Sequence, residues 1–324
     1  MKEITVKSND AGQRLDRFVG KALPLLPESL LQKYIRLKRI KLNGKGAKRD
    51  TRLNKGDVLQ LYINDEFFDK PKEENSYLKV GKPKLNIVYE DENIILLDKK
   101  PGVLCHSAGE WDYNTLIANL QAYLSQNGQW RPKEENSFAP ALCNRIDRNT
   151  GGIVIGAKNA QALRIINEKI RSREIDKYYL LTVCGKPSPS EALLEDWLYK
   201  DEGKNQVFVK KPDFPGAKIA KTEYRLLSSK GKLSLVECHL LTGRTHQIRV
   251  QMAHAGFPLL GDVKYGNAAI NRRYEEKGQA LYSYKLRFDF KTDAGILNYL
   301  NGMEFKVQKV DFAEKYFGLE SLDV

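Results

Sequence analysis

Apolar residues near the start of the chain recur first at helical spacing and then at strand spacing. The helical spacing covers residues 15–23 and returns over 31–35 after Pro27, so two short helices are predicted. Ile40-Lys41-Leu42 then precedes the turn dipeptide Asn43-Gly44, and apolar residues alternate with polar ones over 59–63, which is typical of strands. Residues 1–63 are therefore predicted to form a small module of mixed α and β structure.

A polar stretch separates this module from the rest of the chain. Residues 64–84 show no amphipathic period and are predicted to be a linker, and residues 125–138 are predicted to be a polar insertion. Strands are predicted over 85–89, 94–97, 153–155 and 177–183, and a helix over 159–171. We therefore expect a second, larger module over residues 85–324.

Basic residues are concentrated in the first module. The whole chain of 324 residues has a net charge of +13. Between Lys33 and Lys55 there are ten Lys or Arg residues against the single acid Asp50, a local net charge of +9. Such clustering favours a nucleic-acid phosphate backbone as partner over a general role in solubility. The candidate RNA-binding residues of this module are Lys33, Arg36, Lys38, Arg39, Lys41, Lys45, Lys48 and Arg49.

The four cysteines, at positions 105, 143, 184 and 238, contain no Cys-x-x-Cys pair, so we expect free thiols in a cytoplasmic protein. Cys105-His106 and Cys238-His239 look like paired metal ligands, but adjacent residues on a strand point to opposite faces. No metal site is therefore predicted. No apolar run has the length of a signal peptide or a membrane span, so no membrane partner is expected.

Asp147 is the strongest candidate for chemistry. It is flanked by Arg145 and Arg148 on a turn that ends in Gly151-Gly152 and leads into an apolar run. The two arginines favour the ionised carboxylate, which suits a nucleophile or an anchoring charge better than a general acid. A solvated loop rich in turn residues is the alternative that residue types alone leave open.

The segment 145–152, Arg-Ile-Asp-Arg-Asn-Thr-Gly-Gly, resembles the signature of the RluA family of pseudouridine synthases. The resemblance implies that Asp147 is the nucleophile. Two departures are visible, since Asn144 stands where the family often has His, and Gly151 where it often has Ser. An asparagine offers an amide in place of a titratable ring, so no proton-handling role is assigned to Asn144.

Two further motifs extend the resemblance. Lys177-Tyr178-Tyr179 is similar to the family's Lys-x-Tyr, which implies that Tyr179 is the active-site tyrosine, with Tyr178 one register step away as the alternative. The stretch from Gly243 to Arg249 resembles the Gly-Arg-x-His-Gln-Ile-Arg motif, which implies that Arg249 pairs with the catalytic aspartate through a bidentate contact.

Other matched segments receive less specific roles. His246 alone is more often a hydrogen-bonded structural histidine than a base. Gly261-Asp262-x-x-Tyr265-Gly266 matches a further family element and is expected to be a structural turn. Arg145, Arg148 and Arg244 complete the candidate RNA-binding residues.

The resemblance implies an α+β catalytic domain with a mixed, mainly antiparallel sheet. Residues 1–63 are similar to the small RNA-binding domain of ribosomal protein S-four. The implied reaction converts uridine to pseudouridine in structured RNA without a cofactor, with ribosomal RNA favoured, no DNA partner and a monomeric enzyme. Two other classes remain as alternatives. One is a non-catalytic RNA-binding factor for ribosome assembly, and the other is a hydrolase that uses Asp147 and His246.

Overall fold

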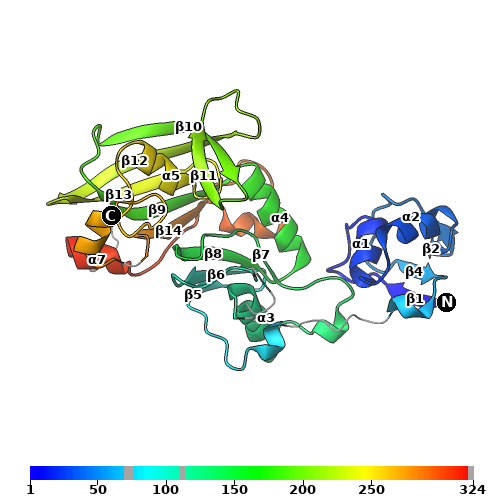
Figure 1. Cartoon of the computed structure of the whole chain (residues 1–324). Coiled ribbons are helices and arrows are strands. Elements are labelled where there is room, and N and C mark those ends of the chain that lie inside the picture. Colours follow the sequence, from blue (N-terminus) through cyan, green and yellow to red (C-terminus); the bar gives the residue numbers. More distant parts are fainter. Residues whose placement is uncertain (69–75, 108, 110–113, 277, 320–324) are drawn as a thin grey trace.

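The computed structural model describes residues 1–68, 76–107, 109, 114–276 and 278–319. These residues form two bodies with separate β-sheets, of which the smaller contains the N-terminus (Figure 1). Its sheet has four strands in the order β1-β4-β2-β3. The elements of this body are β1 (Lys2–Thr5), α1 (Leu15–Ala22), α2 (Glu28–Arg36), β2 (Ile40–Leu42), β3 (Lys45–Gly46) and β4 (Val58–Leu61).

The N-terminal body folds around one hydrophobic cluster. Phe18 from α1, Leu31 from α2 and Leu59 from β4 are all buried in it. Both helices and the strands β2 and β4 appear where the apolar spacing predicts them. Strand β1 was not predicted, because its four residues are too few to show a period. It forms by antiparallel pairing with β4, at the other end of the module.

The larger body is built on an eleven-stranded sheet. Nine strands follow the order β11-β10-β12-β13-β9-β14-β8-β6-β5, and β15 and β7 pair beside β14 and β8. Neighbouring strands are antiparallel except β8 and β14, which are parallel. The strands are β5 (Ile87–Glu90), β6 (Ile94–Lys99), β7 (Ala141–Leu142), β8 (Gly151–Ala157), β9 (Ile175–Cys184), β10 (Glu191–Asp201), β11 (Gln206–Lys210), β12 (Lys218–Lys230), β13 (Leu233–Leu240), β14 (Leu281–Phe288) and β15 (Glu304–Lys306). The mixed, mainly antiparallel sheet confirms the predicted α+β fold class.

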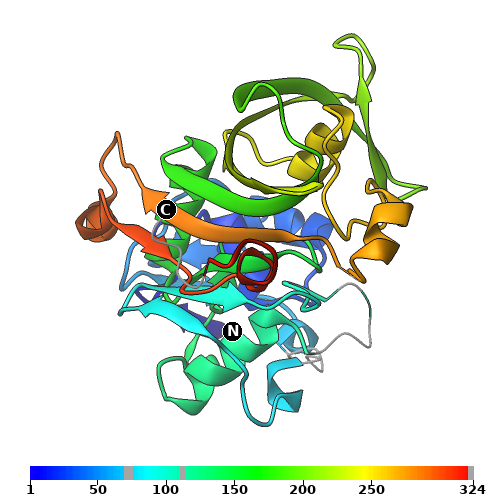
Figure 2. The ribbon, with the colours of Figure 1, turned by 90° about the vertical axis from the view of Figure 1, so that its left-hand side faces the viewer.

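Helices cover both faces of this sheet. The central strands are apolar on both sides: in β6, Ile94 and Leu96 pack into one buried cluster, while Ile95 and Leu97 pack into another. The first cluster includes Ile166 of helix α4, and the second includes Leu120 of helix α3. At the other end, strands β10 to β13 curve around helix α5 (Figure 2). The helices are α3 (Leu116–Gln126), α4 (Ala160–Arg171), α5 (Gln247–His254), α6 (Ala268–Arg273) and α7 (Asp311–Phe317).

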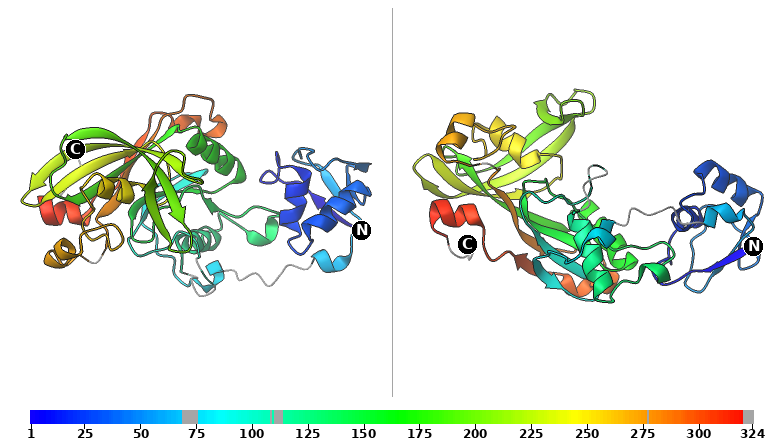
Figure 3. Two further views of the ribbon diagram at one scale, coloured as in Figure 1. Left: turned by 45° about the horizontal axis from the view of Figure 1, so that its top comes forward. Right: turned by 60° about the horizontal axis from the view of Figure 1, so that its bottom comes forward.

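Two polar segments differ from the sequence-based expectation. The predicted linker contains short 3-10 helices at Asp65–Phe68 and Ser76–Lys79, while residues 69–75 lie outside the described part of the chain. The predicted insertion 125–138 begins inside α3 and then approaches the N-terminal body (Figures 1 and 3). Asn136 Nδ2 and Ser137 Oγ donate hydrogen bonds of 2.7 and 2.6 Å to the carboxylate of Asp10. This segment therefore contributes contacts between the two bodies.

Candidate active site

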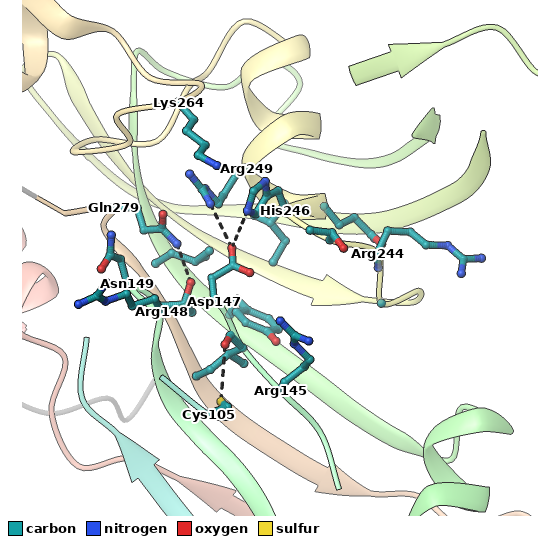
Figure 4. Close-up of a pocket in the computed structure, with 18 of the residues that line it drawn as sticks. Cys105, Arg145, Asp147, Arg148, Asn149, Arg244, His246, Arg249, Lys264 and Gln279 are labelled. Carbon is teal, nitrogen blue, oxygen red and sulfur yellow. Dashed lines mark hydrogen bonds and ion pairs between the residues drawn. The ribbon is translucent and has the colours of Figure 1, made fainter. Parts of the chain in front are cut away.

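The three predicted motifs meet at one pocket in the larger body. The pocket has a volume of about 850 Å³ and is lined mainly by residues 104–107, 144–150 and 243–249, together with Tyr179 and Lys264 (Figure 4). The lining segments come from distant parts of the sequence. Strand pairing brings them together, because β13, β9, β14, β8 and β6 follow one another in the sheet.

Two glycines allow the Asp147 loop to enter the sheet. A Cβ on Gly151 would lie 2.2 Å from the ring of Tyr282, and one on Gly152 would lie 2.2 Å from the carbonyl oxygen of Ser283. Gly152 also has a φ of +115°, which side chains strongly disfavour. The departure from Ser to Gly at position 151 thus fits the close approach of β8 to β14.

Other contacts hold the same loop in place. Asn144 Oδ1 accepts a 2.8 Å hydrogen bond from the backbone N–H of Ile155, so its amide oxygen ties the start of the loop to β8. Gln279 Nε2 donates a 2.7 Å hydrogen bond to Thr150 Oγ1. The loop therefore has partners on both sides of Asp147.

Lys99 is a supporting residue that the sequence did not single out. Its side chain is 1% exposed, and its Nζ donates to the carbonyl oxygens of Lys100, Val103 and Arg148 at 3.1, 2.8 and 2.9 Å. Burial lowers the pKa of Lys99 to about 8. The ammonium joins the turn after β6 to the Asp147 loop. The available signal in the sequence was the apolar run 94–97 followed closely by Lys99-Lys100-Pro101-Gly102.

Asp147 is paired with partners other than the adjacent arginines. Arg249 Nη1 donates to Asp147 Oδ2 at 3.1 Å, and His246 Nε2 lies 3.8 Å from the same oxygen (Figure 4). Neither Arg145 nor Arg148 lies within 4.0 Å of the carboxylate, and Arg148 Nε donates to the Gly102 carbonyl instead. The expectation that Arg145 and Arg148 lie close enough to Asp147 to hold it ionised was therefore wrong, whereas the pairing with Arg249 that the motif resemblance implied is present. The backbone path of the loop, and not proximity in sequence, selects the partner.

Arg249 makes its bidentate contact with Asp262. Nε and Nη2 of Arg249 donate to the two oxygens of Asp262 at 2.6 and 2.9 Å, which leaves a single hydrogen bond for Asp147. The Asp262 side chain is fully buried. Burial alone would raise the pKa of Asp262, but the hydrogen bonds and charge of Arg249 hold it below its ordinary value. The bidentate contact expected for Asp147 thus belongs to a residue expected only in a structural turn.

His246 is oriented toward Asp147 by the same turn. The backbone N–H of Val207 donates to Tyr265 Oη at 2.8 Å, and His246 Nδ1 lies 2.9 Å from that oxygen. Because Tyr265 Oη already accepts, its own proton is available to Nδ1, which favours the tautomer with a proton on Nε2. Nε2 is the atom nearest Asp147.

Several charges act on the His246 imidazole. Burial is the main factor that lowers the pKa of His246, and the positive charges of Arg249 and Lys264 add to it. The carboxylates of Asp147 and Asp262 oppose this shift. The neutral imidazole is therefore favoured near pH 7.

The two candidate tyrosines lie on opposite sides of β9. Tyr179 is 7% exposed and lines the pocket, and burial raises its pKa to about 12. Tyr178 instead stacks on His239 with ring centroids 4.5 Å apart, and Lys285 Nζ lies 4.2 Å from its ring centroid. The structure thus brings Tyr179, Asp147 and Arg249 to one pocket and directs Tyr178 away from it.

Comparison with known proteins identifies the family. A family model described as RNA pseudouridylate synthase matches residues 93–254. An uncharacterized RNA pseudouridine synthase of Mycoplasma genitalium is 34% identical over 320 residues, which are 96% of this chain and 97% of the relative. The chain belongs to the RNA pseudouridine synthase family. It is an isomerase, as the motif resemblance implied.

Other members of the family have more specific names. Ribosomal large subunit pseudouridine synthase D of Borreliella burgdorferi is 31% identical over 89% of this chain and 85% of its own length. Ribosomal large subunit pseudouridine synthase C of Haemophilus influenzae is 28% identical over 96% and 94% of the two chains. The solved structure of human RNA pseudouridylate synthase domain containing 4 covers 70% of this chain and 89% of its own, with a TM-score of 0.55 at 21% identity. That likeness supports the fold.

The basic residues predicted to bind RNA lie on the surface in both bodies of this synthase. In the N-terminal body they lie on the last part of α2, on the β2–β3 hairpin and in the segment just after it. Lys33, Arg36, Lys38, Arg39, Lys45, Lys48 and Arg49 are exposed, and Lys41 is half-buried. In the larger body, Arg145, Arg148 and Arg244 line the active-site pocket.

The cysteines and histidines of the synthase do not form a metal site within the described residues. All four cysteines are free thiols, and no group of three or more metal-ligating side chains is found in the described ranges. His239 lies between Asp176 and Glu223, at 3.1 and 3.0 Å, on the face of the sheet that carries Tyr178. Over the same residues, no helix combines the length and apolar character needed to cross a membrane.

Proposed function

We propose that this pseudouridine synthase isomerises specific uridines in structured RNA, and that large-subunit ribosomal RNA is its substrate. The names of two relatives, ribosomal large subunit pseudouridine synthases C and D, support this choice of RNA. The net charge of +13 supports a polyanionic partner.

Asp147 is the proposed catalytic carboxylate, and one observation carries this role. Its Oδ2 is held by Arg249 at 3.1 Å, whereas no hydrogen bond or ion pair to Oδ1 is found among the described residues. The carboxylate side chain is 31% exposed and lines the pocket. One oxygen is thus anchored, and the other is available to the substrate. Oδ1 would attack the ribose or the base, or remove a sugar proton, and all three routes use an ionised carboxylate.

The reaction requires no redox change. The bond between ribose C1′ and uracil N1 breaks, the base turns, and a bond forms between C1′ and C5, after which C5 loses its proton and N1 gains one. Because a stacked, paired uridine hides its glycosidic bond, the target base must be extruded or unpaired. The aromatic ring of Tyr179 at the pocket wall would receive it by stacking. With a pKa of about 12, Tyr179 is a neutral phenol near pH 7, and its hydroxyl would assist removal of the C5 proton through a hydrogen bond.

The N-terminal body is proposed to be an RNA-binding domain of the ribosomal protein S-four type, bounded at residue 63 and followed by a linker over 64–84. Its two helices and its β2–β3 turn at Asn43-Gly44 support this proposal. Its exposed lysines and arginines would neutralise RNA phosphates, and this contact sets affinity without reading sequence.

The decisive assay measures tritium released from RNA labelled at C5 of uridine. Asp147→Asn keeps the shape of the side chain and removes its charge, so we expect turnover to be lost while RNA affinity stays within a few-fold. Wild-type protein that binds RNA and releases no tritium would instead support a non-catalytic assembly factor. A normal rate for Asp147→Asn would refute the carboxylate mechanism. Mapping pseudouridine in ribosomal RNA from a deletion strain would identify the target uridines.

A further inference from the structure

One face of the β10–β11 hairpin has an unusual composition for an exposed strand pair. In the antiparallel register, Tyr199 lies opposite Phe208, and Trp197 lies opposite Lys210. Residues two apart on a strand share a face, so these four side chains lie on the same side of the hairpin. An antiparallel sheet with one solvated face normally carries polar residues there. Three aromatic residues on this face therefore call for a separate explanation.

The opposite face of the hairpin is the one that packs against the core. Leu198 and Val207 are 4% and 3% exposed, and they form a hydrophobic cluster with Val250 of α5. Figure 2 shows α5 inside the curve of strands β10 to β13. The aromatic residues, which are half-buried, thus lie on the side of the hairpin that faces away from α5.

Phe214, from the loop after β11, extends the aromatic surface. Its ring meets Tyr199 edge-on with centroids 4.9 Å apart, and it is 38% exposed. Lys210 Nζ lies 4.9 Å from the ring centroid of Phe214 and 5.8 Å from that of Phe208. We call Trp197, Tyr199, Phe208 and Phe214 the aromatic face. None of its members belongs to a hydrophobic cluster of the described residues.

The turn of the same hairpin reaches the active-site pocket. Lys200 and Asn205, which flank this turn, both line the pocket that contains Asp147. Lys264, also in the pocket wall, donates from Nζ to the Asn205 carbonyl at 2.6 Å. The hairpin therefore connects the pocket directly to the aromatic face.

We propose that the aromatic face binds single-stranded nucleotides that flank the target uridine, as a second RNA contact of the catalytic body. This inference rests on the proposed function, because it takes RNA as the substrate. Aromatic side chains on a sheet stack bases without reading their identity, and nearby lysines pair with the phosphates between them. Residues 197–218 contain five lysines against three acids, and this excess favours an anionic partner such as RNA over a basic one.

Phe208 gives the sharpest test, because its ring contacts Lys210 and is not part of the core. Phe208→Ala removes the stacking surface, and Phe208→Tyr keeps it. Leu193→Ala is the matched control, since Leu193 is 50% exposed on β10 and precedes Trp197 by four residues on the same face. The probe is an oligouridylate of about 16 nucleotides, and the dissociation constant is measured across a salt series by fluorescence anisotropy.

We expect Phe208→Ala to raise the dissociation constant about fivefold or more without changing the salt slope, because stacking releases no counterions. Phe208→Tyr and Leu193→Ala should remain within twofold of wild type. Lys210→Gln should lower the salt slope by about 0.7, the value for one phosphate contact to a single strand.

Equal affinities for Phe208→Ala and Leu193→Ala would overturn the proposal. A change in self-association of Phe208→Ala, with RNA affinity unchanged, would assign the face to a second copy of the chain and would also overturn it. Tritium release by wild type is measured in parallel. If RNA binds but no tritium is released, the proposed function fails while the affinity comparison still decides the role of the aromatic face. If wild type binds no RNA, both proposals fail.

Discussion

Replacing Arg249 with lysine tests how the catalytic carboxylate is held. The guanidinium makes two hydrogen bonds to Asp262 and one to Asp147. A lysine ammonium lacks the planar fork and cannot reproduce all three contacts. Asp262 is fully buried, whereas Asp147 is 31% exposed, so the ammonium should stay with Asp262. Asp147 then loses its anchor.

The magnitude follows from the lost contact. A hydrogen bond to a charged group contributes about 1.5 to 3 kcal/mol, which corresponds to roughly 10- to 150-fold in rate. Water can partly replace the anchor of a carboxylate that is 31% exposed, so the lower end applies, about 10- to 30-fold. The measurement is the single-turnover rate of tritium release, with RNA affinity determined separately.

Arg244→Lys is the control for this experiment. Arg244 lies in the same motif and lines the same pocket, but its Nε donates to the Ile219 carbonyl at 3.0 Å and makes no ion pair with Asp147. This variant should weaken RNA binding more than it slows the bound reaction. If Arg249→Lys reacts within twofold of wild type at saturating RNA, the anchoring role of Arg249 is wrong.

Four further outcomes are expected. Tyr179→Phe keeps the stacking ring, so RNA affinity should persist while the single-turnover rate falls by the contribution of the hydroxyl. An unchanged rate would mean that Tyr179 acts only by stacking on the base. Lys99→Met removes three hydrogen bonds from a buried ammonium and should lower the free energy of unfolding by about 3 kcal/mol in thermal melts, whereas Lys100→Met, at an exposed position, should have little effect. The pKa of His246 lies below its ordinary value of 6.5, so the wild-type rate should hold as pH falls to about 6.5. Below that pH the rate should decline, because the imidazolium pairs with the catalytic carboxylate. A decline that persists unchanged in His246→Gln would exclude this residue as its cause. A fragment that starts near residue 80 should still modify RNA at low salt. Its slope of log affinity against log salt should be lower by roughly 2 to 4 units if three or four basic residues contact RNA. Equal slopes for the fragment and the full chain would show that the basic cluster is not part of the RNA interface.

Local patterns in the sequence were sufficient to predict those helices and strands whose own residues determine their structure. The helices α1, α2 and α4 appear where apolar residues recur every three or four positions, because this spacing gives each helix one face to bury. The apolar run of β6 predicted a buried strand, since both of its faces are covered. The motif around Asp147 pointed to the family, which the comparisons confirm.

The tertiary structure decided how the groups of the site meet, beyond the pairing of Arg249 with Asp147 that the motif resemblance implied. Charge placement along the chain favoured Arg145 and Arg148, which make no ion pair with Asp147, and only the structure shows that Arg249 gives Asp147 one hydrogen bond and its bidentate contact to Asp262. Asp262 lies in the expected turn, where its carboxylate accepts from the backbone of Lys264 and Tyr265, and the structure adds that the same carboxylate holds the Arg249 guanidinium. Which of two adjacent tyrosines faces the pocket depends on the register of β9 between β13 and β14. Spacing along a strand shows that neighbours face opposite ways, but only the packing of both sheet faces determines which side becomes the pocket.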